Sequence, residues 1–568
     1  MSAATPLLEI DQLSVSFGGH AAVRPFDLTI ARGEIVALVG ESGSGKSTVA
    51  LATMGLLPER ARVQGAIRFE GKPLFAQSER EWSALRGDRI SMIFQEPMTS
   101  LNPLQPVGKQ VAEALTLHRP MSAQAARKEA LELLELVHLP EPRRRFAHYP
   151  HQLSGGQRQR VMIAIAVACR PGLLIADEPT TALDVTIQAQ ILALIDRLRR
   201  ELSMAVLLIT HDLGVVGRWA DRVVVMKDGA KVEEASSRQL FTQPAQPYTR
   251  ALLGASLHFG AGLHYRDARL TDAPRAKPRS TAETPARVLL DARDVRVDYD
   301  GVRAVDRVSF EIRAGETVGL VGESGCGKSS LSRALTRLVE PTGGRIVFDG
   351  DDVTHRGRRA LRPYRRRVQM IFQDPYGSLN PRHTVERTLG HALAIHGVSN
   401  RRERHDRIRR IVDAVGLPES ALRRYPHEFS GGQRQRIGIA RALVLRPELV
   451  ICDEPVSALD VSIQAQILDL LADLKHELGL ALLFISHDLS VVRYIADRVL
   501  VMQAGRIVES GDHASIWTSP QHTYTRALID AVPSSHAPFL FDTRKIDRDF
   551  QAQAAADLDL DLDASVPR

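Results

Sequence analysis

The stretch GESGSGKST, from Gly40 to Thr48, returns almost letter for letter as GESGCGKSS, from Gly322 to Ser330. Each copy fits the pattern Gly-x-x-x-x-Gly-Lys-[Ser/Thr] and lies between a short apolar run, which predicts a buried strand, and a helical segment. Glycines let such a loop turn successive N–H groups toward phosphate oxygens, and the following helix adds its positive N-terminal end. Lys46 would reach the β and γ phosphates of a nucleotide, and Ser47 would be a ligand of Mg²⁺. One copy would serve one nucleotide, so the second copy needs an explanation.

The rest of the chain repeats as well. FQEPMTSLNP returns as FQDPYGSLNP after 278 positions, and LSGGQRQR returns as FSGGQRQR after 276. The repetition predicts two homologous domains fused end to end. We place the first domain at residues 1–253, a linker at 254–287, the second domain at 288–533 and a poorly ordered tail at 534–568. The linker is rich in Pro, Ala and charge between Thr271 and Arg287, which is typical of an extended or disordered segment.

Hydrophobic patterns predict the fold of each domain. Continuous apolar runs such as GEIVALVG, GLLIADEP and AVLLITHD are typical of buried strands, and the segment from about Val107 to Ala168 is mostly helical. DRVVVMKDGAKVEE predicts two strands joined by a hairpin turn at Asp228-Gly229. Strands that alternate with helices indicate an α/β fold with a parallel sheet, here with a helical insertion.

Composition limits the classes of protein that the chain can belong to. It has 568 residues, a net charge of +7 and three cysteines that form no CxxC pair, which argues against a disulfide framework or a zinc site. No stretch reaches the roughly 18 apolar residues that span a bilayer, and the first residues do not resemble a signal peptide. We interpret most of the arginine runs as solvated surface rather than as a nucleic-acid patch.

Two further motifs carry chemistry. Asp177 and Asp453 end apolar strands, where a carboxylate would hold Mg²⁺ beside the phosphate loop, and the glutamate that follows each could polarise an attacking water. In LSGGQ, Ser154 can cap a helix whose first N–H groups form a second anion site. A small ligand could not bridge both anion sites within one domain.

The ordered set of phosphate loop, FQEP, LSGGQ, IADEP, ALD and a histidine resembles the ATP-binding cassette (ABC) ATPases over residues 7–253 and 288–533. The resemblance implies two tandem P-loop NTPase domains, each with a parallel-sheet core, an antiparallel β subdomain and a helical subdomain. In that family two cassettes dimerise head to tail, so that each ATP lies between the phosphate loop of one cassette and the LSGGQ signature of the other. This explains the second loop, because each site takes half of its parts from the other domain.

The resemblance assigns residues to both sites. The catalytic residues are Gln95, Glu178 and His211 in one site and Gln373, Glu454 and His487 in the other. The Mg²⁺ ligands are Ser47, Gln95 and Asp177, with Ser329, Gln373 and Asp453. ATP would be bound by Phe17, Gly40, Glu41, Ser42, Gly43, Ser44, Gly45, Lys46, Ser47, Thr48, Ser154, Gly155, Gly156 and Gln157, and by Tyr299, Gly322, Glu323, Ser324, Gly325, Cys326, Gly327, Lys328, Ser329, Ser330, Ser430, Gly431, Gly432 and Gln433.

Some of these assignments are particular to this chain. Phe17 and Tyr299 match the aromatic that stacks on adenine, although Phe17 also fits a core position of a strand. Asp184 and Asp460 would line the seam between the cassettes. Both sites keep their glutamate and histidine, which predicts two hydrolytic sites. Cys326 stands where the first loop has Ser44, and we hypothesise that it makes the second site sensitive to thiol reagents.

The segments QEPMTSLNPLQPVG, QDPYGSLNPRHTV and QPYTRALL look like those of the di- and oligopeptide, nickel and glutathione uptake cassettes. This similarity implies a bacterial importer with two membrane permeases and an extracytoplasmic binding protein. The chain would then lie peripherally at the cytoplasmic face of the inner membrane. Some such cassettes carry a cysteine cluster for iron-sulfur, but here no cysteine lies between Cys169 and Cys326. The alternative is a soluble tandem cassette that acts on ribosomes or DNA, although the short, proline-containing linker and the lack of CxxC pairs disfavour it.

Overall fold

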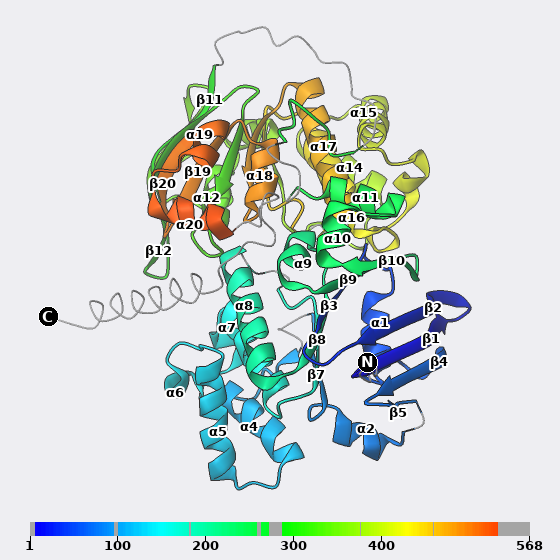
Figure 1. Cartoon of the computed structure of the whole chain (residues 1–568). Coiled ribbons are helices and arrows are strands. Elements are labelled where there is room, and N and C mark those ends of the chain that lie inside the picture. Colours follow the sequence, from blue (N-terminus) through cyan, green and yellow to red (C-terminus); the bar gives the residue numbers. More distant parts are fainter. Residues whose placement is uncertain are drawn as a thin grey trace, which may run out of the picture. The chain divides into compact units, whose positions relative to one another are not determined.

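The computed structural model describes residues 6–75, 77–95, 100–180, 183, 185–257, 263–271, 287–374, 376–457 and 459–531. The chain divides into two compact units, with the boundary between Leu253 and Gly254. Each unit has the same order of sheets and helices, and many of the elements are labelled in Figure 1.

The first unit contains two sheets. An antiparallel sheet has the order β2-β1-β4-β5 and consists of β1 (Leu8–Phe17), β2 (His20–Ile30), β4 (Ala61–Phe69) and β5 (Lys72–Pro73). A six-stranded sheet has the order β10-β9-β3-β8-β7-β6 and consists of β3 (Ile35–Val39), β6 (Ile90–Ile93), β7 (Leu173–Asp177), β8 (Ala205–Ile209), β9 (Arg222–Lys227) and β10 (Ala230–Ser236). Its strands are parallel except for β10, which pairs antiparallel with β9 across the predicted Asp228-Gly229 turn.

Helices surround the six-stranded sheet and form a helical subdomain between β6 and β7. They are α1 (Lys46–Thr53), α2 (Glu79–Leu85), α4 (Val107–His118), α5 (Ala123–Leu136), α6 (Pro142–Arg145), the 3₁₀ turn η1 (Pro150–Gln152), α7 (Gly155–Val167), α8 (Val185–Leu202), α9 (Leu213–Trp219), α10 (Ser237–Thr242) and α11 (Pro247–Ala255). The predicted helical insertion corresponds to α4 through α7.

The second unit repeats this plan. Its antiparallel sheet is β12 (Val302–Arg313), β11 (Val288–Tyr299), β14 (Gly343–Phe348) and β15 (Asp351–Asp352), in that order. Its six-stranded sheet has the order β16-β17-β18-β13-β19-β20, with β13 (Thr317–Val321), β16 (Val368–Ile371), β17 (Leu449–Asp453), β18 (Ala481–Ile485), β19 (Arg498–Gln503) and β20 (Arg506–Asp512). Its helices are α12 (Lys328–Leu335), α13 (Arg362–Arg367), α14 (Val385–Ile395), α15 (Arg401–Ala414), η2 (Glu419–Arg423), η3 (Pro426–Glu428), α16 (Gly431–Leu443), α17 (Val461–Leu478), α18 (Leu489–Ile495), α19 (His513–Thr518) and α20 (Thr523–Ala531).

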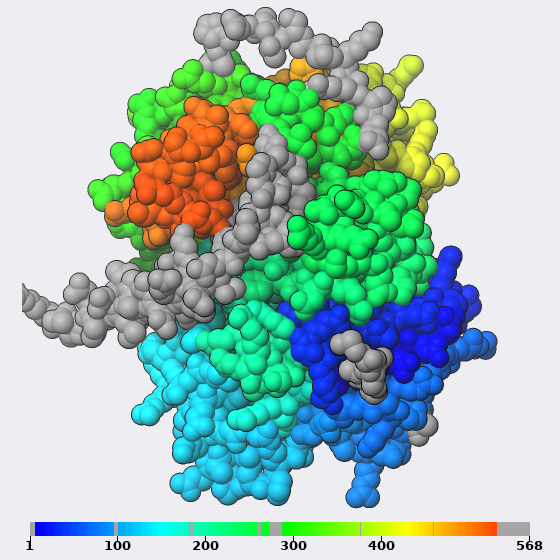
Figure 2. Space-filling model, in the orientation of Figure 1, coloured from blue at the N-terminus to red at the C-terminus, as the bar shows by residue number. Residues whose placement is uncertain are grey.

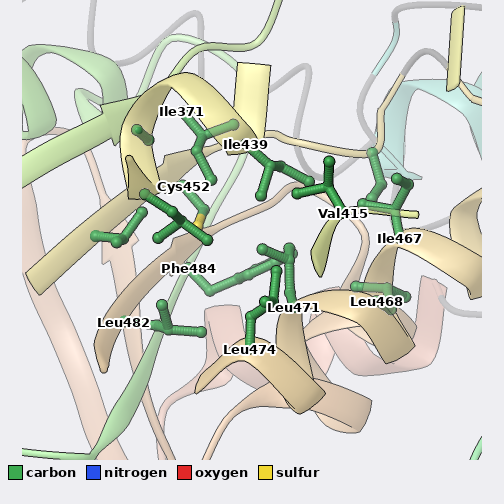
Figure 3. Packing of buried hydrophobic residues seen from close by; sticks show 14 of the residues in the cluster. Ile371, Val415, Ile439, Cys452, Ile467, Leu468, Leu471, Leu474, Leu482 and Phe484 are labelled. Atoms are coloured by element: carbon green, nitrogen blue, oxygen red, sulfur yellow. The ribbon is translucent and has the colours of Figure 1, made fainter. Parts of the chain in front are cut away.

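The six-stranded sheets are buried on both faces, which is why their strands are apolar runs rather than alternating patterns. In β8, Val206 and Leu208 belong to the core shared with the helical subdomain, whereas Leu207 and Ile209 belong to the core on the opposite face. The second unit packs in the same way. Figure 3 shows Cys452 of β17 among apolar side chains that include Ile371 and Phe484 of the neighbouring strands.

The segment after α11 packs on the second unit. Tyr265 donates from its hydroxyl to Asp497 Oδ1 at 2.9 Å and accepts from Lys475 Nζ at 2.6 Å. Asp469 accepts from the backbone N–H groups of Leu270 and Thr271 at 3.2 and 3.0 Å. The predicted linker therefore begins with a segment that is held on the second unit.

Other expectations fall on parts of the chain that the structure does not cover. Residues 272–286 of the linker and the predicted tail lie outside the described residues. Within the described ranges, no helix combines the length and the apolar character needed to cross a membrane.

Candidate nucleotide sites

The first phosphate loop joins β3 to α1 at the carboxyl edge of the sheet. Gly45 caps α1 with φ of +99°, and a Cβ at this position would lie 2.6 Å from the carbonyl oxygen of Ala22. Gly327 caps α12 with φ of +106° and would bring a Cβ to 2.2 Å from the Ala304 carbonyl. Both positions require glycine, because an L side chain would be strained there and would clash with backbone.

The loop lysine is buried and already held by the loop. Lys46 Nζ donates to the carbonyl oxygens of Gly40 and Glu41, each at 2.8 Å, and lies 3.4 Å from Ser44 Oγ. Lys328 does the same with Gly322 and Glu323 at 2.7 and 2.8 Å. The ammonium group is therefore positioned inside the curl of the loop, where it could contact phosphate oxygens.

Ser47 and Asp177 meet at the end of β7. Ser47 donates from Oγ to Asp177 Oδ1 at 3.2 Å. Burial raises the pKa of Asp177, and the neighbouring charge of Glu178 acts in the same direction. A buried carboxylate beside a hydroxyl is a set of hard oxygen donors suited to Mg²⁺, and a bound cation would favour the charged carboxylate.

Glu178 is the centre of a small polar cluster. Gln95 donates from Nε2 to Glu178 Oε2 at 2.8 Å, and His211 Nδ1 lies 3.2 Å from Oε1 of the same carboxylate. The backbone of Glu178 has φ of +49°, and its N–H donates to the Ile209 carbonyl at 2.8 Å. Two segments far apart in sequence, one with Gln95 and one with Ile209 and His211, thus hold Glu178, whose backbone conformation is uncommon for a residue other than glycine.

The second unit rebuilds the same cluster. Ser329 donates to Asp453 at 3.2 Å, Gln373 donates to Glu454 at 2.9 Å, and His487 Nδ1 lies 3.2 Å from Glu454 Oε2. Burial works against both charges of the last pair, but their mutual hydrogen bond lowers the pKa of Glu454 and raises that of His487. Burial raises the pKa of Asp453, as it does for Asp177.

The second site also has features that the motifs did not predict. Ser332 adds a contact from its hydroxyl to Asp453 Oδ2 at 3.3 Å, where the first domain has Ala50. Tyr524 lies in TYTRAL (residues 523–528), which repeats the PYTRAL of residues 247–252, and it accepts a hydrogen bond from the backbone N–H of Glu323 at 2.9 Å. The recurrence of that motif was a signal of importance, but its spacing gave no indication that it reaches the phosphate loop.

Cys326 lies inside the second loop with its sulfur 3.8 Å from Lys328 Nζ. Burial raises the pKa of the Cys326 thiol, and only 9% of the residue is exposed. A buried thiol with a raised pKa has little thiolate at neutral pH, so the geometry disfavours the hypothesis of thiol sensitivity.

The signature residues begin α7 and α16. Ser154 accepts from the N–H of Gln157 at 3.3 Å, and Gln157 Oε1 accepts from the N–H of Ser154 at 3.1 Å, which is a capping box. Ser430 and Gln433 repeat it in the second unit. Gly156 and Gly432 let these helices approach α8 and α17, since a Cβ would lie 2.9 Å from Ile187 and 2.4 Å from Ile463.

The two aromatics predicted to stack on adenine lie at the ends of strands. Phe17 and Tyr299 lie at the ends of β1 and β11, where Phe17 packs partly against the core and Tyr299 is 39% exposed. Asp460 is the N-cap position of α17. Asp184 lies outside the described residues.

Comparison with known proteins identifies this arrangement. The family described as ABC transporter matches residues 23–181 and 305–457, more than half of the chain. The chain belongs to the ABC transporter family. Its two domains are tandem ABC ATPase domains, as the sequence predicted. The oligopeptide/dipeptide transporter C-terminal region also matches twice, at residues 232–282 and 508–551.

Curated relatives extend over nearly the whole chain. The "Glutathione import ATP-binding protein GsiA" of Pectobacterium atrosepticum is 49% identical to this chain. The alignment covers 93% of this chain and 89% of that protein. The "Peptidoglycan transport ATP-binding protein YejF" of Agrobacterium fabrum is 48% identical, with 93% of this chain and 96% of that protein aligned. This ABC protein is therefore an ATP-binding ATPase coupled to transport, and it works with permease subunits at a membrane.

Proposed function

We propose that the chain energises a bacterial importer of peptides or a related small solute, in the di- and oligopeptide, glutathione or nickel class, through two hydrolytic ATP sites. The observation that carries the proposal is the complete duplication of the catalytic cluster. Each unit pairs a phosphate-loop lysine with an Asp, a Glu, a Gln and a His in nearly the same geometry. Among the described residues, both units therefore present the same set of groups for hydrolysis.

In this proposal, residues of the other unit would complete each ATP site. One site joins Lys46 and Glu178 to Ser430 and Gly432, and the other joins Lys328 and Glu454 to Ser154 and Gly156. The N-termini of α7 and α16 support this, because the first backbone N–H groups and the positive end of a helix suit a phosphate. Fusion in one chain gives each half its partner at high effective concentration.

The chemistry follows from the side chains. Lys46 and Lys328 would neutralise phosphate charge, and the oxygen atoms of Ser47 and Asp177, with Gln95, would hold Mg²⁺ in the first site. Ser329, Asp453 and Gln373 would do so in the second. The ion itself would neutralise charge on the transferred phosphate. Glu178 and Glu454 would orient and polarise the attacking water, and His211 and His487 hold those carboxylates in place.

The partners are two transmembrane permeases and an extracytoplasmic solute-binding protein, with the chain peripheral to the cytoplasmic face of the inner membrane. The segments around Gln95 and Gln373 would receive the permeases. Phe94 and Phe372 at these segments are 41% and 38% exposed, which leaves apolar surface for a partner. The hydrogen bonds from Gln95 and Gln373 to the two glutamates would link permease contact to hydrolysis.

The solute class rests on the relatives and on the C-terminal region. The GsiA proteins are named for glutathione import, YejF is named for peptidoglycan transport, and the C-terminal regions match oligopeptide and dipeptide transporters. Glutathione and peptidoglycan fragments are both peptide-like, so a short peptide or peptide conjugate is the solute that fits all three.

The test is a tagged pull-down from detergent-solubilised membranes of the native cell, followed by mass spectrometry. We expect two multi-span permeases to co-purify, and their binding protein to bind peptides, glutathione or nickel in a titration. A chain that stays soluble and brings down ribosomes or DNA-bound proteins would contradict the proposal.

A further inference from the structure

The second unit carries a strongly basic surface that the first unit lacks. Residues 355–367 contain seven arginines and no carboxylate, and residues 396–414 contain six arginines and three carboxylates. The equivalent residues of the first domain, 77–89 and 118–136, each contain three basic and three acidic residues. We call residues 355–367 and 396–414 the basic face. Together the two segments contain thirteen arginines and three carboxylates, whereas the charges of their counterparts in the first domain balance.

The two segments of the basic face are joined. Arg362 of α13 donates from its guanidinium to the carbonyl oxygen of Ile395 at the end of α14, and residues 396–400 lead from there into α15. His405 of α15 lies 3.9 Å from Glu386 of α14, which ties that helix to the same surface. Figure 1 labels α14 and α15, and Figure 2 shows this part of the surface in yellow.

Among the described residues, most arginines of the basic face have no carboxylate partner within the protein. Arg356, Arg367, Arg407 and Arg409 have carboxylate partners. Among the described residues, no carboxylate lies within 4.0 Å of Arg358, Arg359, Arg366, Arg401, Arg402, Arg404 or Arg410. All of these but Arg404 are exposed. Unpaired arginines gathered on one surface raise the local positive potential, which favours an anionic partner.

Apolar side chains stand beside the charge. Ile395, whose carbonyl Arg362 contacts, is 50% exposed, and Leu338 is 54% exposed next to Arg337, whose carbonyl accepts from Arg365 at 2.6 Å. Leu117 and Leu56 occupy the equivalent positions of the first domain and are also exposed. The apolar pair is thus common to both domains, whereas the arginines belong to the second alone.

We propose that the basic face binds the anionic lipid headgroups of the membrane. Its orientation rests on the proposed function: along the chain, residues 355–367 of the face precede the Gln373 segment and residues 396–414 follow it. A surface beside the permease contact faces the bilayer. Anionic lipids give the cytoplasmic leaflet a negative potential that attracts clustered arginines, and exposed apolar side chains add burial at the headgroups. Cytoplasmic loops of membrane proteins carry an excess of Lys and Arg, so a permease loop is the less complementary partner.

The test uses the purified full-length chain and vesicles, without permeases, so its outcome is independent of the pull-down that tests the proposed function. Binding is measured by co-sedimentation with neutral phosphatidylcholine vesicles and with vesicles that contain 30% phosphatidylglycerol (roughly the anionic fraction that gives a strong surface potential). We expect binding to the anionic vesicles only, and weaker binding as salt is raised.

A five-site variant of the basic face, with Arg358, Arg359, Arg366, Arg401 and Arg402 changed to Gln, should bind the anionic vesicles about 10³-fold less tightly. The matched control removes the same charge from exposed positions of the first unit, by changing Arg60, Arg62, Lys72, Arg143 and Arg238 to Gln, and should keep most of the binding. Both variants should keep basal ATPase activity, which shows that they fold.

Equal losses in the two variants would overturn the proposal, and so would equal binding to neutral and anionic vesicles or no binding to either. If purified permeases in neutral detergent bind the parent chain but not the basic-face variant, the face meets protein rather than lipid, and the proposal is wrong while the importer function stands.

Discussion

Gln373 donates a hydrogen bond from Nε2 to Oε2 of Glu454 over 2.9 Å, and Gln95 makes the same contact with Glu178 over 2.8 Å. The glutamine that leaves the edge strand of each six-stranded sheet therefore touches the carboxylate at the end of the next strand. A movement of the glutamine segment would therefore shift the glutamate carboxylate that would polarise the attacking water.

The first prediction concerns these carboxylates. Changing both Glu178 and Glu454 to Gln keeps the size of the side chains and an oxygen that can accept from Gln95 and Gln373. It removes the base, so we expect ATP turnover to fall by about 10²-fold or more while ATP still binds. A fluorescent ATP analogue measures binding and phosphate release measures turnover. Near-normal turnover would show that neither glutamate acts in hydrolysis. Loss of ATP binding would show that the glutamates contribute to nucleotide affinity instead.

The second prediction is a dependence on pH. Since the pKa of His487 is raised above its ordinary 6.5, its contribution to stability is complete below 6.5 and is lost as pH rises through the folded value. Since the pKa of Glu454 is lowered from 4.5, its contribution is complete above 4.5 and is lost as pH falls through the folded value. The pair therefore stabilises the nucleotide-free second unit most between these two pH values.

Changing His487 to Gln should lower the melting temperature of the second unit by about 2–4 °C near pH 6, for a contribution of about 1 kcal/mol. The difference should shrink as pH rises further and the histidine of the parent chain loses its proton. Calorimetry across this range checks it. The control is Arg409→Gln, which breaks the exposed pair with Glu419 and should show no such change from pH 6 to pH 8. A constant effect of His487→Gln across that range would show that packing, not charge, accounts for it.

The local features of these sites could be predicted from the sequence because they depend on neighbouring residues. Strand, loop and helix follow one another at Lys46, the hairpin turn falls at Asp228-Gly229, and Ser154 caps its helix. Apolar runs of strand length indicated the sheet buried on both faces, and the repeat predicted the second domain.

Contacts between distant segments could not be predicted in the same way. Glu323 and Tyr524 are 201 positions apart, and the segment that holds Tyr265 meets Asp497 after 232. Periodicity tells which face of an element is buried but not which element covers it. Ser332 was also missed, because a serine in the helix after the loop has no pattern that distinguishes a site contact from a solvated position.

The third prediction tests Tyr524. Replacing it with Phe keeps the ring and removes the oxygen that accepts from the Glu323 N–H, so the second phosphate loop loses one hydrogen bond. We expect ATP affinity at the second site to fall about 5-fold, as the loss of about 1 kcal/mol would give. ATP affinity is measured in the background of Lys46→Ala, so that the second site alone contributes to the measured binding. Tyr248→Phe, the equivalent change in the first unit, should leave that affinity unchanged. Equal effects of the two changes would contradict a local role for Tyr524.

The fourth prediction concerns Cys326. Because burial raises the pKa of its thiol, we expect N-ethylmaleimide to label this residue slowly in the folded chain at pH 7.5 and rapidly in urea. Peptide mass spectrometry measures the labelling. Cys326→Ser, which places the serine of the first loop at this position, should leave ATP turnover unchanged. Rapid labelling in the folded state, with loss of nucleotide binding, would restore the hypothesis of a thiol-sensitive site.

The last prediction separates two adjacent glycines of the second signature. A Cβ at Gly432 would lie 2.4 Å from Ile463 Cγ2, whereas a Cβ at Gly431 would lie 3.8 Å from Leu459 Cδ2, an ordinary contact. Gly432→Ala must therefore push α16 from α17 or force Ile463 out of place. We expect it to lower the free energy of unfolding of the second unit by about 1–3 kcal/mol, the usual cost of overpacking. Gly431→Ala should change it little.

Urea denaturation of both variants measures the difference, and Ile463→Ala provides the check on its cause. In the background of Ile463→Ala the obstructing methyl group is gone, so Gly432→Ala should cost much less than it does alone. If Gly432→Ala is equally costly in both backgrounds, its effect does not come from Ile463, and the closeness of α16 to α17 is not the reason for glycine. If Gly431→Ala is as destabilising as Gly432→Ala, the requirement lies instead in the backbone of the helix N-terminus, and the two glycines share one role.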